Sequence, residues 1–242
     1  MKTRLLNTRK AQDISSSDEN KRIKMKDIII DNLKTEPKIK NFFDTLKYNN
    51  IKIENVDVLS CQKKKNGELL FAYLQIEAKD DENNKLPPYI FIRGDATVVV
   101  PILQVEGDMQ EYYLCVEQRR VADGSYHLEF PAGMLDRNAD NPAYAAVKEM
   151  AEETGLKIGE EQLIPLNNAK PLFTSPGACD EKIYYYKTYI RINKEEFREL
   201  NGKLLNNSEE NERIKLKICT KSEFLSATKS NMGFTAINLL EM

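Results

Sequence analysis

Residues 128–156 read LEFPAGMLDRNADNPAYAAVKEMAEETGL and combine a glycine turn, a helix start and a cluster of acids. Asn141 is a good N-cap, and Pro142 suits the first helical position because its missing N–H would be unpaired there anyway. Gly155 suits the left-handed position that follows a helix. The sequence therefore predicts a helix that begins at Asn141 and runs to Gly155.

The predicted helix carries three acids close together, Glu149, Glu152 and Glu153. Offsets of three and four residues place their carboxylates on one face, about one turn apart. Like charges placed this way destabilise a solvated helix by roughly 0.2–0.5 kcal/mol per pair. A divalent cation would reverse that sign, and Mg²⁺ favours one or two carboxylates plus substrate phosphates. The helix is therefore either a solvated acidic surface or a metal site for attack at phosphorus.

The residues around the three glutamates follow a definite spacing. Gly133 is followed by six residues, Asp140, seven residues and then KEMAEETGL from Lys148. This pattern resembles the Nudix box, in which Gly, five residues, Glu, seven residues and Arg-Glu-apolar-x-Glu-Glu-x-Gly-apolar form a loop–helix–loop site for metal and diphosphate. The chain differs by one extra loop residue, by Asp140 for Glu and by Lys148 for Arg. Its helix keeps the register of the family.

Four segments resemble the ADP-ribose and ADP-sugar pyrophosphatase branch of that family, and the resemblance runs from Ile92 to the C-terminus. They read EQRR at 117–120, LEFPAG at 128–133, SPGACDE at 175–181 and EENERI at 209–214. The resemblance implies substrate contacts by Arg120, Glu129, Gly133, Ser175, Gly177 and Glu181. It implies metal ligation by the Ala132 carbonyl and by Glu149, Glu152 and Glu153.

The same resemblance implies a reaction. A nucleoside diphosphate sugar, ADP-ribose or ADP-glucose, would be hydrolysed to AMP and a sugar phosphate with Mg²⁺, for which Mn²⁺ can substitute. Glu210 or Glu212 would accept a proton from the attacking water, and Glu152 belongs to the same catalytic set. By residue type alone, an acidic loop entering a strand is usually a solvent-facing one.

Three other functions remain open at this stage. The chain could be a Nudix hydrolase for another nucleoside diphosphate derivative, or a catalytically silent module of the same fold that binds ADP-ribose or RNA. Loss of the metal glutamates usually marks such modules, and all three are present here. An isomerase acting on a prenyl diphosphate would need a cysteine near the site, where Cys179 is the candidate.

The order of the predicted elements indicates an α/β fold, a Nudix α/β/α sandwich on a mixed sheet with a small N-terminal α+β extension. We expect a flexible arm over 1–24, a helix and strands over 25–90, and the Nudix domain over 91–242. We expect a loop over 201–211. In the resembling enzymes the working unit is a homodimer, and residues 25–90 are the candidate dimerisation element.

Composition narrows the class of protein. Lys+Arg 36 against Asp+Glu 38 gives a net charge of −2 and no electrostatic case for a nucleic-acid partner. Four cysteines without CxxC spacing argue against structural zinc and against a disulfide framework, so a reducing compartment is expected. Since no apolar run approaches the roughly 18 residues of a membrane helix, we expect a cytoplasmic protein, with organelle targeting by the basic N-terminus as the alternative.

Overall fold

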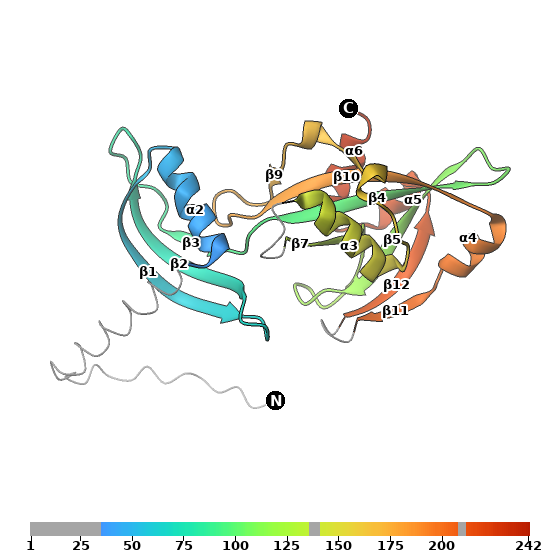
Figure 1. The fold of residues 1–242 in the computed structure, drawn as a ribbon, viewed down its shortest axis with the longest axis horizontal. Helices are drawn as coiled ribbons and strands as arrows, with labels where there is room; N and C mark the ends of the chain where they lie inside the picture. The colour runs from blue at the N-terminus through green and yellow to red at the C-terminus, as the bar shows by residue number, and fades with distance from the viewer. Residues whose placement is uncertain (1–34, 136–140, 208–211) are drawn as a thin grey trace. The chain divides into compact units, whose positions relative to one another are not determined.

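The computed structural model describes residues 35–135, 141–207 and 212–242 (Figure 1). The chain divides into two compact units between Tyr89 and Ile90. The predicted boundary between 90 and 91 lies one residue further along the chain.

The described part of the first unit is a helix and a small sheet. Its elements are α2 (Pro37–Tyr48), β1 (Lys52–Lys63) and β2 (Leu69–Lys79). Strand β3 (Tyr89–Ile92) begins at the last residue of this unit and completes the strand order β1-β2-β3. Pro37 opens α2, the helix expected in this part of the chain, and Ile39 is its buried residue. Strands β1 and β2 form an antiparallel hairpin, and Gly67 in its turn has a φ of 86°, a backbone conformation that favours glycine.

The second unit carries a nine-stranded sheet with helices on both faces. The elements described in it are β4 (Ala96–Val105), β5 (Glu111–Arg119), β6 (Tyr126–Glu129), β7 (Ala132–Met134), α3 (Pro142–Thr154), η1 (Glu160–Gln162), β8 (Ile164–Pro165), η2 (Asn167–Ala169), β9 (Leu172–Phe173), β10 (Lys182–Ile192), α4 (Lys194–Leu200), β11 (Leu204–Asn207), β12 (Glu212–Cys219), α5 (Lys221–Ala227) and α6 (Asn231–Leu239).

The sheet is mixed. Its main path is β11-β12-β5-β4-β10-β8, in which β4 and β10 are parallel and the other pairs are antiparallel. On one face Met150 of α3 packs with Val99, and on the other Phe224 of α5 and Ile237 of α6 pack with Val98. Successive strand residues face opposite sides, so β4 supplies both cores. The predicted α/β/α sandwich is confirmed.

The sheet opens beside β4. Strand β5 pairs with β4 only at Ile102–Gln104, whereas the first residues of β4 pair with β7. The end of β5 pairs instead with β6. Residues 126–134 therefore run between two diverging strands, and the Val99 amide donates to the Pro131 carbonyl at 2.9 Å on the way. The stretch that the sequence singles out lies at this opening.

The expected loop over 201–211 is wrong in part, because Leu204–Asn207 forms β11 and pairs with β12. These residues carry no β-branched side chains, so their extended conformation comes from the partner strand. Helix α4 was also not expected. No helix in the described ranges is long and apolar enough to cross a membrane.

Candidate active site

Helix α3 begins and ends where the sequence predicts. The Asn141 side chain accepts a hydrogen bond from the Ala143 amide at 3.0 Å, and Gly155 has a φ of 75°. Ala146 and Met150 are fully buried against the sheet. The caps fix the ends of the helix and the buried side chains fix its rotation, so the directions of its acids are determined.

Glu153 joins the helix to β7. Its side chain is only 4% exposed, and Oε2 accepts a hydrogen bond from the Ala132 amide at 2.9 Å. A backbone N–H bonded to an ionised carboxylate makes one of the stronger protein hydrogen bonds. This bond brings two predicted metal ligands, Glu153 and Ala132, into direct contact.

Glu149 lies against the next residue of the same strand. A methyl group placed on Gly133 would come within 2.0 Å of Glu149 Cδ and 2.1 Å of Oε1. The predicted substrate contact, Gly133, therefore makes room for a carboxylate. Consecutive residues of β7 thus receive two of the three glutamates.

Glu152 points elsewhere. Its side chain is 39% exposed, and Oε2 lies 3.7 Å from Lys148 Nζ one turn earlier in the helix. Among the described residues, no three His, Cys, Asp or Glu side chains come close enough to hold a metal ion together. Asp140 and Glu210 lie outside the described residues, and Glu212 is described only as the first residue of β12. The structure therefore brings Glu149 and Glu153 together without Glu152.

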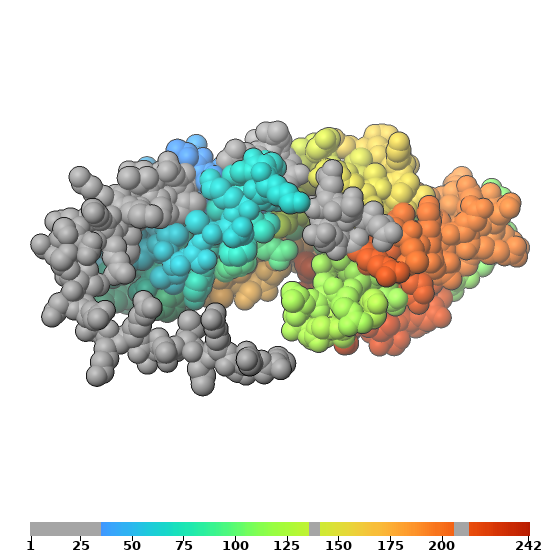
Figure 2. Space-filling model, turned by 90° about the horizontal axis from the view of Figure 1, so that it is seen from below, coloured from blue at the N-terminus to red at the C-terminus, as the bar shows by residue number. Residues whose placement is uncertain are grey.

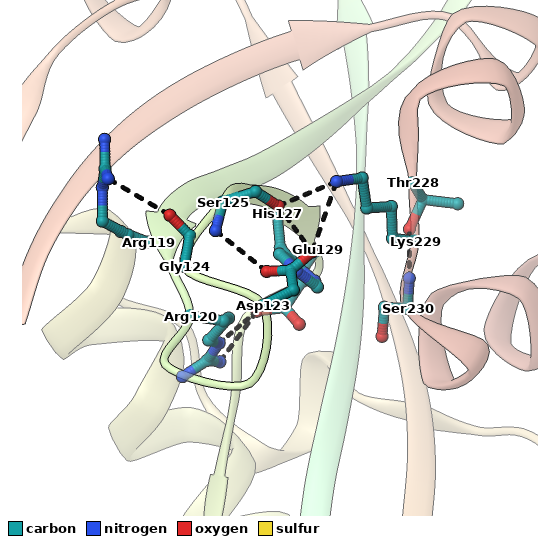
Figure 3. Close-up of polar contacts among 10 residues, drawn as sticks. All are labelled: Arg119, Arg120, Asp123, Gly124, Ser125, His127, Glu129, Thr228, Lys229 and Ser230. Atoms are coloured by element: carbon teal, nitrogen blue, oxygen red, sulfur yellow. Dashed lines mark hydrogen bonds and ion pairs between the residues drawn. The ribbon is translucent and has the colours of Figure 1, made fainter. Parts of the chain in front are cut away.

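Arg120, at the turn of the β5–β6 hairpin, forms an ion pair with Glu129, the last residue of β6 (Figure 3). Arg120 Nε and one terminal nitrogen lie 2.8 and 2.7 Å from the same oxygen, Glu129 Oε2. Glu129 is 8% exposed, whereas the Arg120 side chain is 37% exposed. The buried carboxylate fixes the guanidinium plane, whose other N–H groups take no part in this pair.

The predicted substrate loop is closed on itself. The Ser175 carbonyl accepts from the amides of Ala178 and Cys179 at 3.0 and 2.9 Å, and the Thr174 amide donates to the Glu181 carbonyl at 3.1 Å. A methyl group on Gly177 would meet nothing within 4 Å. Ser175, Gly177 and Glu181 therefore belong to one compact loop.

Two residues that the sequence reasoning missed anchor this loop. Arg93 lies 3.3 Å from the buried Glu181 carboxylate, and Asp180 Oδ1 accepts from the amides of Arg93 and Gly94 at 2.7 and 3.2 Å. The Asp95 carbonyl then accepts from the Leu135 amide at 2.9 Å, directly after β7. The loop and the two glutamates are thus linked through the first residues before β4. No spacing in the sequence marks Arg93 as the partner of Glu181.

Asp95 is a further charged group at this edge. Burial raises the pKa of Asp95, and the Lys182 ammonium, 3.4 Å from its carboxylate, opposes the shift. The pair joins the starts of β4 and β10, the two parallel strands. The Lys182 ammonium thus balances the charge of the Asp95 carboxylate beside the loop of residues 175–181.

The chain was compared with known proteins. The family model described as NUDIX domain matches residues 93–233. "Nudix hydrolase 14, chloroplastic" of Arabidopsis thaliana is 33% identical over 168 residues, which cover 67% of this chain and 54% of that protein. "ADP-sugar pyrophosphatase" of Mus musculus is 44% identical over 64 residues, 26% of this chain and 28% of that protein.

Among solved structures, one titled "Crystal structure of ADP compounds hydrolase" superposes with a TM-score of 0.55 at 16% identity, covering 79% of this chain and 92% of that chain. At that identity the likeness concerns the fold. The chain spans about half the length of the Arabidopsis relative and less of the mouse one.

Proposed function

The chain belongs to the Nudix family, and from that membership we propose that it hydrolyses the diphosphate of an ADP-sugar, ADP-ribose or ADP-glucose, to AMP and a sugar phosphate. The observation that carries the proposal is the set of contacts along residues 129–133. Glu129 holds Arg120, the Ala132 amide donates to Glu153, and Gly133 lies against Glu149. The guanidinium of Arg120 and the carboxylates of Glu149 and Glu153 thus all contact the stretch of residues 129–133.

The donor set fits a hard divalent cation. Glu149, Glu153 and the Ala132 carbonyl offer only oxygen, which Mg²⁺ prefers and Mn²⁺ accepts. We propose these groups as the ligands, with Glu152 as a further one once its side chain leaves Lys148. When bound, the cation would neutralise the diphosphate and lower the pKa of a bound water.

The remaining steps belong to the side chains. Arg120 is proposed to bind a phosphate oxygen while Glu129 keeps its guanidinium oriented, since guanidinium and phosphate match in a bidentate geometry. The loop with Ser175, Gly177 and Glu181 is proposed to contact the substrate. Glu210 or Glu212 would take the proton of the attacking water, a contribution of about 10²–10⁴-fold.

Support for the ADP-sugar comes from two sources. The flanking motifs are those of the ADP-sugar branch, and the mouse relative carries the name ADP-sugar pyrophosphatase. A rate panel with Mg²⁺ would test the choice, with ADP-ribose, ADP-glucose, UDP-glucose, NADH, diadenosine polyphosphates and capped RNA as substrates. The proposal requires the ADP-sugars to lead that panel. Ligand binding without Mg²⁺-dependent phosphate release would instead favour the silent binding module.

The substitution Glu153→Gln tests the chemistry. Glutamine keeps an oxygen that can accept from the Ala132 amide but loses the charge, so the fold should be retained. We expect kcat to fall by more than about 100-fold, because even outer partners of metal ligands cost 10–100-fold when mutated. Turnover with Mg²⁺ and a thermal melt provide the two measurements.

Glu199→Gln is the matched control, because it makes the same change from glutamate to glutamine at an exposed position of α4. It should leave kcat and the melting temperature unchanged. Near-normal turnover of Glu153→Gln would refute the metal-ligand role.

A further inference from the structure

The turn between β5 and β6 is held by a polar network (Figure 3). Asp123 accepts from the Ser125 amide at 2.9 Å and from the Ser125 hydroxyl at 2.7 Å, and it lies 3.0 Å from His127 Nε2. These contacts, the Ser125 amide above all, hold the pKa of Asp123 well below its usual range. The turn therefore carries a fixed negative charge.

The C-terminal part of the chain supplies the counter-charge. Lys229, between α5 and α6, donates from Nζ to the Ser125 hydroxyl at 2.8 Å and lies 3.4 Å from Asp123 Oδ2. Its neighbour Thr228 donates to the Leu128 carbonyl on β6 at 2.9 Å. The α5–α6 junction thus holds the hairpin at two places, 100 and 104 residues away in sequence.

Arg120 is the residue at which this turn closes. Its amide donates to the Ser125 carbonyl at 3.0 Å, and its carbonyl accepts from the Gly124 amide at 2.9 Å. The side chain of Arg120 is fixed separately, by Glu129. In the space-filling view the light-green residues, which include the turn, lie at the surface beside orange residues from the C-terminal part of the chain (Figure 2). A change in the shape of the turn therefore moves the Arg120 backbone.

We propose that Lys229 is a positioning residue for the diphosphate site: by binding Ser125 and Asp123 it sets the turn that carries Arg120. The inference rests on the proposed function, since it assigns Arg120 to the substrate phosphate. Exposed ion pairs contribute little to global stability, typically 0.2–1 kcal/mol, so the predicted effect is on geometry. Displacement of a positioning group by about 1 Å can cost up to 10²-fold in rate.

The test is Lys229→Met, which removes the ammonium and keeps the length of the side chain. We expect KM for ADP-ribose to rise about 5- to 20-fold with kcat within about twofold, the size of coupling usual between residues of one network. Calorimetry with a nonhydrolysable α,β-methylene ADP should show a matching loss of affinity. Lys229→Arg should restore most of the wild-type KM, and in an Arg120→Gln background Lys229→Met should add no further rise.

Lys221→Met is the control, because it removes an ammonium from α5 that pairs with Glu241 away from the turn. An unchanged KM in Lys229→Met, or a rise that adds in full to that of Arg120→Gln, overturns the proposal. A second readout does not need turnover. His127 is the only histidine, so its single imidazole NMR signal and the exchange of the Gly124 and Ser125 amides report on the turn.

In Lys229→Met we expect that signal to shift and those two amides to exchange faster. Unchanged values would overturn the positioning role even if the enzyme is active. Absence of ADP-sugar hydrolysis in the wild-type chain, with these changes present, would instead overturn the proposed function.

Discussion

Gly133 illustrates how a single missing side chain shapes the site. Its φ is not among the positive values of the chain, so the residue is not needed for a turn. What requires glycine is the Glu149 carboxyl group, which occupies the space of a Cβ atom. A glycine that resembles part of a substrate motif therefore has a steric role toward a proposed metal ligand.

Gly133→Ala should disable the site without unfolding the chain. The new methyl group displaces the flexible Glu149 side chain, while the backbone stays in an allowed region. We expect kcat to fall by about 10- to 100-fold, in the range for displaced metal-site partners, and the unfolding free energy to change by about 1 kcal/mol or less. Mn²⁺ affinity by calorimetry should fall in parallel.

The double variant Gly133→Ala/Glu149→Ala isolates the cause. If the clash with Glu149 accounts for the effect, the double variant should match Glu149→Ala alone in activity and in stability. A double variant clearly less stable than Glu149→Ala would show that the methyl group meets something else.

Residues that carry local signals were predictable at this scale, and residues whose partners are distant were not. The ends of helix α3 are predictable from the capping and backbone preferences of single residues, namely Asn141, Pro142 and Gly155. Arg93 and Lys229 are ordinary surface cations in the sequence. Their partners, Glu181 and Asp123, become neighbours only when distant segments of the chain pack together.

At the scale of elements, β10 is buried on both faces. Tyr186 packs with α3 and Tyr185 with α6, as expected for a strand in a covered parallel pair. Burial raises the pKa of Tyr185 to about 12, and a hydrogen bond with Thr235 opposes the shift. This hydroxyl reports on the contact between β10 and α6.

Tyr185→Phe should change how the stability depends on alkaline pH. The folded-state pKa is above the ordinary value of 10, so the unfolded chain loses its phenolic proton first. Stability from this group is complete below about pH 10 and is lost as pH rises toward 12, by about 2–3 kcal/mol in total. Urea denaturation over that range should show a smaller decline in the variant. Equal declines would contradict the burial of the hydroxyl.

The elements with a strong local sequence pattern were the ones that could be predicted. The capped helix α3 and a mixed sheet were predicted, and both are present. Short elements were missed for a physical reason: β11 depends on β12, and α4 is only seven residues long. Its capping signal, Asn193 with Glu196, is present in the sequence but lies between two strands.

At the scale of the whole molecule, the first unit carries exposed aromatic and aliphatic side chains. The Tyr73 and Tyr89 rings stack at 6.1 Å but stay 39% and 48% exposed, and Leu59 on β1 is 47% exposed. Within the described residues β1 is an edge strand, and exposed edges with apolar side chains favour pairing with another chain. The dimer implied by the family resemblance stays a prediction with this surface as its candidate.

Sedimentation can test that surface. We expect the full chain to sediment as a dimer and a fragment of residues 90–242 to sediment as a folded monomer, because the fragment lacks β1 and β2. The variant Tyr73→Ser in the full chain should weaken the dimer by about 10-fold or more if the ring is central to the contact. A dimeric fragment would place the interface in the second unit.

The parallel pairing of β4 with β10 also constrains how the chain folds. Ala96 pairs with Ile183, 87 residues later, so the pairing of β4 with β10 closes a long loop. The chain must lose the conformational entropy of this loop before the contacts between the two strands can offset the loss. Topologies dominated by such distant pairs fold slowly. During synthesis β4 cannot pair with β10 until most of the chain has left the ribosome. In that interval the apolar residues of β4 are accessible to other chains, which favours aggregation.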